Sequence, residues 1–457
     1  MTARARTLLA TVWNALGGAP ALLDGVRFAG EGGLASAYPV TDMASATIGA
    51  AALALAELAH GRGGKFPDVT VDRRLASFWF AFSIRPAGWE MPAPWDPIAG
   101  DYQTQDGWIK LHTNAPHHRA AAEKILGQQT DKITMAKEVI RWKKQELEAA
   151  IVQAGGCAAE MRSVAQWAAH PQGRAIADEP LAHIESFSSA PLPDRGATPA
   201  RPLAGVRVLD LTRVLAGPVA SRFLAGFGAD VLRIDPPDWD EPGVVPEVTL
   251  GKRCARLDIK TAAGRATFEG LLSQADVMLH GYRGDALDRL GYDAAARRKL
   301  SPGFIDVSLC AYGWSGPWAL RRGFDSLVQM SCGIADAGQQ WKQAAQPTPL
   351  PVQALDHATG YLMAAAVIRG ITQRLINTNS ITARLSLART AKLLINAGAA
   401  EMEPPLAAES FFDIASPIEG TDWGNAKRLK PPVAIRDVPL YWTLPARALG
   451  SAQPDWG

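Results

Sequence analysis

The sequence of 457 residues is short of the features that mark several classes of protein. It has only four cysteines, without disulfide density or metal-ligand spacing, so we expect no metal site and a reducing, cytoplasmic location. Lysine and arginine number 47 against 45 acidic residues, so no field of one sign favours nucleic acid or a membrane surface. The most apolar run, residues 43–59, is shorter than the ~20 residues of a membrane span and contains Glu57. We therefore expect it to be a core helix.

The organisation of the chain is marked by residues 188–205, "SSAPLPDRGATPARPLAG", which are rich in Ser, Pro and Gly. This composition predicts a linker. In residues 206–374, short apolar runs such as "GVRVLDL", "ADVLRID" and "FIDVSLCAYG" alternate with helical segments. That alternation predicts an α/β domain with a doubly wound, Rossmann-like parallel sheet, whose ligands lie beyond the carboxyl ends of the strands.

Residues 1–187 have a different pattern, which predicts a unit containing a smaller α+β domain. An Ala-rich helix follows Asp42, and "DYQTQDGWIKLHT" gives two short β-runs around a "QDG" turn. A single charged amphipathic helix is expected near residues 130–153.

A faint internal repeat joins the two ends of the chain. "YPVTDMASATIGAAALAL" at 38–55 is similar to "LPVQALDHATGYLMAAAVI" at 350–368, and Asp42 then aligns with Asp356. Each helix is followed by a strand-like run, "DVTVD" and "TARLS" respectively. Ala-rich helices match by chance easily, but the shared Pro-Val, Asp and following strand favour an internal duplication. Residues 375–457 are then interpreted as a shortened second copy.

The turn after the first strand of the 206–374 block, "TRVLAGP", lacks the closely spaced glycines of a dinucleotide loop. NAD is therefore disfavoured. The apolar Val214, Leu215 and Ala216 suit a flat, non-polar group such as an adenine face.

Five blocks in unbroken order, "GVRVLDLTRVLAGPVASRFLAGFGADVLRID", "GKRCARLDIKTAAG", "ADVMLHGYRGDALDRLG", "PGFIDVSLCAYGWSGP" and "GFDSLVQMSCG", end in "ALDHATG". From residue 203 to about 374 the chain resembles the class III coenzyme A-transferases. Residues 1–187 resemble the later half of the same family, so the halves are reordered. The resemblance implies coenzyme A or acyl-CoA as substrate rather than as a bound cofactor, a small carboxylic acid as the second substrate, and an interlocked homodimer whose threading is here partly intramolecular.

The resemblance also assigns roles to residues. It implies that Asp356 of "ALDHATG" is the nucleophile, which attacks a thioester to form a mixed anhydride. At the start of a helix, we expect its pKa to be lowered and the carboxylate to stay ionised; the alternative is a simple N-cap. Asp42 is a weaker candidate, because no nucleotide-binding block precedes it.

For coenzyme A, the matching positions lie at the ends of the predicted strands, and the alternative for each basic residue is a solvated surface charge. The candidates are Val214, Leu215, Ala216, Leu257, Asp258, Ile259, Lys260, Gly281, Tyr282, Arg283, Arg289 and Arg322.

The chain departs from the family pattern at several points. His280 and Gly281 replace a Glu-Asn pair, and the glycine-rich loop that covers the nucleophile has no clear counterpart. Three functions follow: CoA transfer between an acyl-CoA and a free acid, racemisation of an acyl-CoA, or acyl-CoA binding without catalysis. Racemisation is disfavoured because Phe324 of "GFD" stands where the racemase branch has histidine, and phenylalanine cannot carry a proton.

Overall fold

The centre of the structure is a seven-stranded, largely parallel sheet. The computed structural model describes residues 3–282 and 285–457. The strands, in their order across the sheet, are β10 (Lys252–Arg256), β9 (Asp230–Asp235), β8 (Arg207–Leu211), β11 (Val277–His280), β12 (Ile305–Cys310), β13 (Asn379–Ser386) and β7 (His183–Ser188). All neighbours are parallel except β7, which runs antiparallel to β13.

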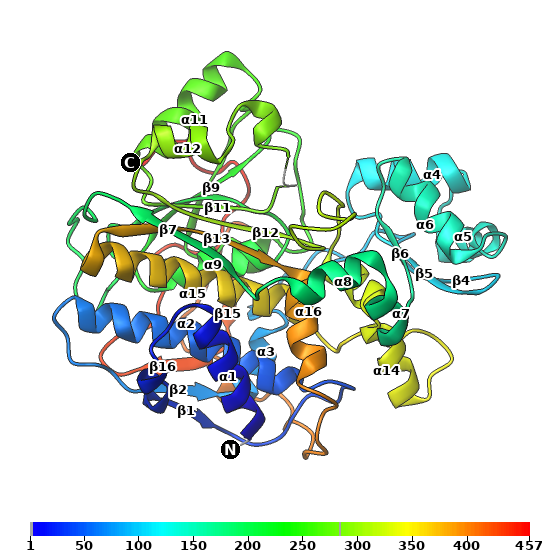
Figure 1. Ribbon diagram of the computed structural model, residues 1–457, viewed down its shortest axis with the longest axis horizontal. Helices are drawn as coiled ribbons and strands as arrows, with labels where there is room; N and C mark the ends of the chain where they lie inside the picture. The colour runs from blue at the N-terminus through cyan, green and yellow to red at the C-terminus, as the bar shows by residue number, and fades with distance from the viewer. Residues whose placement is uncertain (1–2, 283–284) are drawn as a thin grey trace.

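Helices cover both faces of this largely parallel sheet, so the α/β class expected from the sequence is present (Figure 1). Alternate residues of β8 point to opposite faces, as strand geometry requires. Leu209 packs in one core with α11 (Ala262–Gln274), near α12 (Ala294–Leu300). Val208 packs in the other core with α9 (Ala216–Gly226) and α15 (Ala354–Asn377).

The sheet draws its last two strands from outside the range 206–374 that the sequence predicted for it. β13 follows α15, and β7 precedes the linker segment, of which residues 189–206 contain no helix or named strand. The pairing of β7 with β13 spans about 190 residues of chain, for example from Ser188 to Asn379. Backbone pairing at this separation leaves no local pattern, so the range predicted from sequence is too short.

Below α15 lies a second helical layer made of α2 (Val40–Gly61) and α1 (Ala3–Ala15), followed by the small sheet β1 (Val26–Ala29), β2 (Val69–Asp72) and β16 (Val433–Ile435) (Figure 1). Among the described residues, only α2 is long and apolar enough to cross a membrane, and 89% of its most apolar window is buried inside the fold. It is the core helix that the sequence predicted.

Residues 1–187 do not form a separate body. Phe80 stacks on Tyr361 of α15 with ring centroids 6.1 Å apart, and Arg369 of α15 pairs with Glu57 of α2. The buried Glu247 carboxylate accepts hydrogen bonds from Ser83 N at 3.0 Å and Arg428 Nη1 at 2.9 Å, which joins three distant segments. This is the packing that intramolecular threading requires. The duplication and the interlocked dimer stay predictions.

A small sheet of β4 (Gly100–Thr104), β5 (Gly107–Leu111) and β6 (Ala158–Glu160) shares a hydrophobic core with α4 (Pro116–Leu126), α5 (Lys132–Val139) and α6 (Lys144–Gln153). These elements lie in the segment for which the sequence predicted a smaller α+β domain. The single helix expected near 130–153 is wrong, because the chain breaks between α5 and α6. The "QDG" turn holds that break: Gln105 N donates to Trp142 O at 2.9 Å, and Asp106 Oδ1 accepts from Lys144 N at 2.8 Å.

Candidate active site

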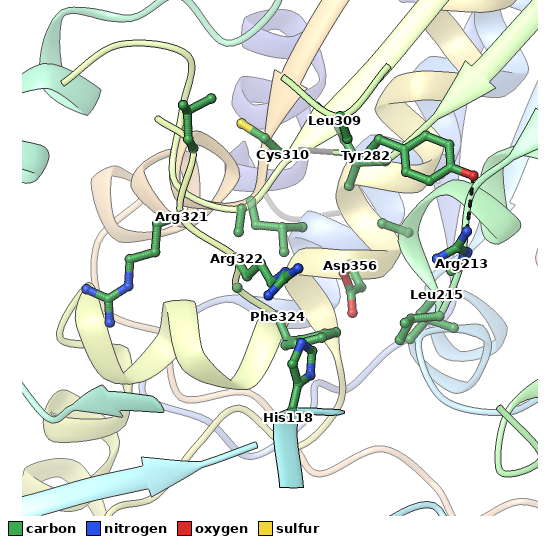
Figure 2. A pocket seen from close by; sticks show the side chains of 18 of the residues that line it. His118, Arg213, Leu215, Tyr282, Leu309, Cys310, Arg321, Arg322, Phe324 and Asp356 are labelled. Atoms are coloured by element: carbon green, nitrogen blue, oxygen red, sulfur yellow. Dashed lines mark hydrogen bonds between the residues drawn. The ribbon is translucent and has the colours of Figure 1, made fainter. Parts of the chain in front are cut away.

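A cavity of about 320 Å³ opens at the carboxyl ends of β8, β11 and β12, where ligands of such sheets bind. Leu211 ends β8, Tyr282 follows β11, and Cys310 ends β12, and all three line the cavity. Asp356, the third residue of α15, lines it too and is only 8% exposed. Figure 2 shows its carboxyl facing the same space as the Arg322 guanidinium and the Phe324 ring.

The start of α15 is capped from another helix, α13 (Asp325–Ser331). Asp325 Oδ2 accepts hydrogen bonds from Leu355 N at 2.8 Å and from Asp356 N at 2.9 Å. Its other oxygen accepts from Gln329 Nε2 at 2.5 Å. The first amides of α15 are therefore used by the Asp325 carboxylate, and are not left for the side chain of Asp356.

This arrangement overturns the expectation that the helix start lowers the pKa of Asp356. Burial, and then the neighbouring Asp325 charge, raise the pKa of Asp356 well above its ordinary value. Burial also raises the pKa of Asp325 to about 6, although the two backbone N–H groups oppose that rise. The pair holds Asp356 as a poorly hydrated carboxyl.

The turn before α9 is strained. Val214 has φ +64°, a backbone conformation that is rare for a β-branched residue, and its N–H donates to Glu241 Oε2 at 2.9 Å. The turn brings Val214, Leu215 and Ala216 to the wall of the cavity. These three residues lie where the resemblance placed an adenine face.

Arg213 is a cavity residue that the sequence analysis missed. Its guanidinium lies 4.6 Å from the Trp239 ring centroid and 5.1 Å from that of Tyr282, and Nη2 donates to Tyr282 Oη at 3.0 Å (Figure 2). Arg213 belongs to the "TRV" tripeptide of the predicted turn, but its aromatic partner Trp239 belongs to a loop that is distant in sequence. Together with Arg322, Arg213 gives the cavity two guanidinium groups, which suit a ligand with phosphates. Arg321 also lines the cavity, but its guanidinium pairs with Glu148 at 3.0 Å.

The small domain forms the opposite wall from the same chain. His117 and His118 at the start of α4 line the cavity, and the His112 ring stacks on Phe324 with centroids 3.7 Å apart. Burial, and then His117, lower the pKa of His118 to about 3, so its ring is neutral. No sequence signal marked these histidines as site residues.

The structure brings some, but not all, of the residues predicted to bind coenzyme A to this cavity. Gly281, Tyr282 and Arg322 line the cavity with the 214–216 turn. Leu257, Asp258, Ile259 and Lys260 line neither this cavity nor its neighbour described below. Arg289 also lies off both, and its side chain, 69% exposed, pairs with Asp285 at 2.5 Å. Arg283 falls outside the described residues.

The two other acidic and basic candidates have partners elsewhere. Asp42 occupies the third position of α2, as Asp356 does in α15, but lies 3.1 Å from the buried Arg73 guanidinium and lines neither cavity. His280 Nε2 lies 3.4 Å from Asp306 Oδ1 at the end of β11. Within the described part of the chain, no group of three or more His, Cys, Asp or Glu side chains is arranged to hold a metal ion.

Comparisons with known proteins match the part of the chain that contains Asp356. The family model described as CoA-transferase family III matches residues 203–409, which include Asp356 and the 214–216 turn. An acetyl-coenzyme A transferase of Hypoxylon pulicicidum is 34% identical over 187 residues, which cover 40% of this chain and 32% of that protein. A succinate–glutarate CoA-transferase of Agrobacterium fabrum is 33% identical over 186 residues, which cover 36% and 46% respectively.

A probable fatty acyl-CoA transferase of Mycobacterium tuberculosis is 31% identical over 192 residues, covering 39% of this chain and 48% of that protein. A crystal structure of the Mycobacterium tuberculosis protein has a TM-score of 0.39 at 29% identity, and covers 43% of this chain and 56% of that one. The chain thus spans between about a third and a half of the length of these curated relatives.

Proposed function

Because this chain belongs to CoA-transferase family III through its residues 203–409, we propose that it moves coenzyme A from an acyl-CoA to a free carboxylic acid. The observation that carries the proposal is the place of Asp356. A buried carboxyl lies in a cavity at the strand ends, beside guanidinium groups that suit a polyanionic ligand.

The reaction needs a nucleophile that is regenerated, and a carboxylate provides one. Ionised Asp356 attacks the thioester carbonyl, the C–S bond breaks, and the CoA thiolate leaves behind a mixed anhydride. The thiolate then attacks the Asp356 carbonyl, which releases the donor acid and leaves an aspartyl-CoA thioester. The acceptor carboxylate attacks that thioester, which expels the thiolate and forms a second mixed anhydride. The thiolate then attacks the acceptor carbonyl, which gives the new acyl-CoA and frees Asp356.

The geometry supports each of these needs. The raised pKa of Asp356 reflects poor hydration, and a carboxylate that has lost hydration is the more reactive nucleophile. The guanidinium groups of Arg213 and Arg322 can hold the phosphates of coenzyme A, while the apolar turn at Val214 offers a face for its adenine. The two substrates then share one nucleophile in turn, as in a ping-pong reaction.

Racemisation is supported less well. It requires a proton donor and an acceptor on the two sides of the α-carbon. The ring at the relevant place is Phe324, and it lines the cavity together with Asp356. The neighbouring His118 is neutral and buried, with neither ring nitrogen hydrogen-bonded.

The test is a coupled assay with the full chain, in which a panel of acyl-CoA donors is incubated with free carboxylic acids and the new thioesters are identified by mass. Transfer is expected for at least one pair, and Asp356→Ala should lower its rate at least about 1,000-fold. Binding of acyl-CoA with no transfer for any pair, in both proteins alike, would instead favour a non-catalytic acyl-CoA-binding protein.

A further inference from the structure

A second cavity, of about 250 Å³, adjoins the first. The two share three wall residues, Val214, Trp239 and Phe324. Phe324 immediately precedes Asp325, whose carboxylate accepts a hydrogen bond from the backbone N–H of Asp356. The shared wall is therefore fixed to the same helix start as the proposed nucleophile.

The two cavities carry opposite charge. The first has the guanidinium groups of Arg213 and Arg322, whereas no lysine or arginine is among the described residues that line the second. Asp96, Asp240 and Glu241 line the second instead. The arginines beside these carboxylates are already in ion pairs: Arg119 pairs with Asp96 at 2.9 Å, and Arg233 pairs with Glu241 at 2.5 Å. Lys110 and Arg213 lie 5.7 Å and 4.6 Å from the Trp95 and Trp239 ring centroids, but neither is among the residues that line this cavity. A further carboxylate placed here would lose hydration beside three other carboxylates.

The remaining residues that line the second cavity are uncharged, and four of them, Trp95, His112, Trp239 and Phe324, are aromatic. Trp95 meets His112 edge-on with centroids 5.8 Å apart, and His112 stacks on Phe324. Burial lowers the pKa of His112 to about 3, so its ring is uncharged. The Trp239 indole N–H is buried without a hydrogen-bond partner, and a neutral oxygen of a ligand would satisfy it.

We propose that the second cavity binds the acyl group of the donor thioester, and that it selects a short, uncharged, apolar or aromatic acyl group over one that ends in a carboxylate. The inference rests on the proposed function. The volume lies below the about 300–1,000 Å³ of ordinary ligand pockets, which suits a short chain. The charges direct the CoA phosphates to the first cavity and the uncharged acyl group to the second.

The test compares butyryl-CoA with succinyl-CoA, which have four acyl carbons each and differ by a methyl against a carboxylate at the far end. With acetate as acceptor, kcat/KM for butyryl-CoA should exceed that for succinyl-CoA by about tenfold or more. Equal values, or a preference for succinyl-CoA, would overturn the proposal.

Two variants of one exposed residue that lines the second cavity test the proposed preference directly. The side chain of Ala93 lines the second cavity and makes no hydrogen bond that a substitution would break. Ala93→Lys supplies the missing cation and should narrow the ratio of the two kcat/KM values. Ala93→Met, of similar length but uncharged, should leave the preference for butyryl-CoA in place. If Ala93→Lys left the ratio as in the native chain, the second cavity would not be the acyl site.

Failure of the proposed function would give a different experimental result from failure of the acyl-site proposal. If neither thioester gives transfer to any acceptor, the transferase proposal fails, and calorimetric titration of the two thioesters then tests the cavity directly. Tighter binding of butyryl-CoA, reversed or narrowed by Ala93→Lys, would still support it. Equal affinities that Ala93→Lys leaves unchanged would overturn it.

Discussion

The carboxylate of Asp325 accepts a hydrogen bond from the backbone N–H of Asp356 at 2.9 Å, and so occupies the helix start that would otherwise stabilise the Asp356 anion. Burial, and then the Asp325 charge, raise the pKa of Asp356, whereas burial raises the pKa of Asp325.

The pH dependence of transfer should report this pair. Asp356 must lose its proton to attack, so kcat/KM for the acyl-CoA should rise with pH through a pKa well above that of an ordinary aspartate. Asp325→Asn removes the neighbouring negative charge, which lowers the pKa of Asp356 and moves the rising limb to lower pH. The control is Glu185→Gln, whose side chain is 66% exposed, and its profile should match the native one. A limb that stays in place in Asp325→Asn would show that the pair is not coupled.

The same pair should reduce the stability of the protein at high pH. Because the folded-state pKa of Asp356 is raised, the stability linked to its proton is fully present below the unfolded pKa of about 3.9 and is lost as the pH rises through the folded pKa. Asp356→Asn keeps a neutral group, so at about pH 8 its free energy of unfolding should exceed the native value by about 1–3 kcal/mol. The gain should shrink near pH 4, and urea denaturation at both pH values measures it. No gain at the higher pH would contradict the raised pKa.

Arg213 should contribute to the binding of coenzyme A. Arg213→Ala is expected to raise KM for acyl-CoA about tenfold, because the guanidinium lies in the cavity between two aromatic rings. Arg289→Ala is the matched control, since Arg289 lies off the cavity and should leave KM unchanged. The opposite pattern, with Arg289→Ala the more harmful change, would favour the assignment made from the resemblance.

A substitution in the strained turn at Val214 should change the stability of the protein and its binding of acyl-CoA in opposite directions. Val214→Gly relieves the positive φ and should raise the free energy of unfolding by about 1 kcal/mol, while the loss of an apolar wall raises KM for acyl-CoA. Gln343→Gly relieves a similar φ of +53° away from the cavities, so it should add stability without a change in KM. Thermal denaturation and steady-state kinetics measure both effects. If Val214→Gly left KM unchanged, the turn would not touch the ligand.

Much of the fold follows from local sequence. The apolar runs at 207–211, 230–235 and 277–280 form the parallel strands that their pattern predicts, because a strand buried on both faces needs a continuous apolar run. The strands β7 and β13 lie outside the range predicted for the sheet, because their pairing joins chain segments about 190 residues apart.

The site divides in the same way. Asp356 and the 214–216 turn were predicted, since each lies within a short motif next to a strand or helix end. Asp325 was not predicted as the partner of Asp356, and Trp239 and His118 were not predicted at all. Trp239 and His118 reach the cavity, and Asp325 reaches the start of α15, through tertiary packing of a long loop, the small domain and α13, which no spacing in the sequence records.

The central claim is that Asp356 forms a covalent acyl intermediate. The most direct measurement is the peptide mass of the full chain after incubation with a donor acyl-CoA and hydroxylamine, which converts an aspartyl anhydride or thioester to a hydroxamate. The account predicts one hydroxamate, on Asp356, together with loss of activity that depends on acyl-CoA. Continued transfer with Asp356 unmodified, or a hydroxamate on another carboxyl such as Asp42, would contradict it.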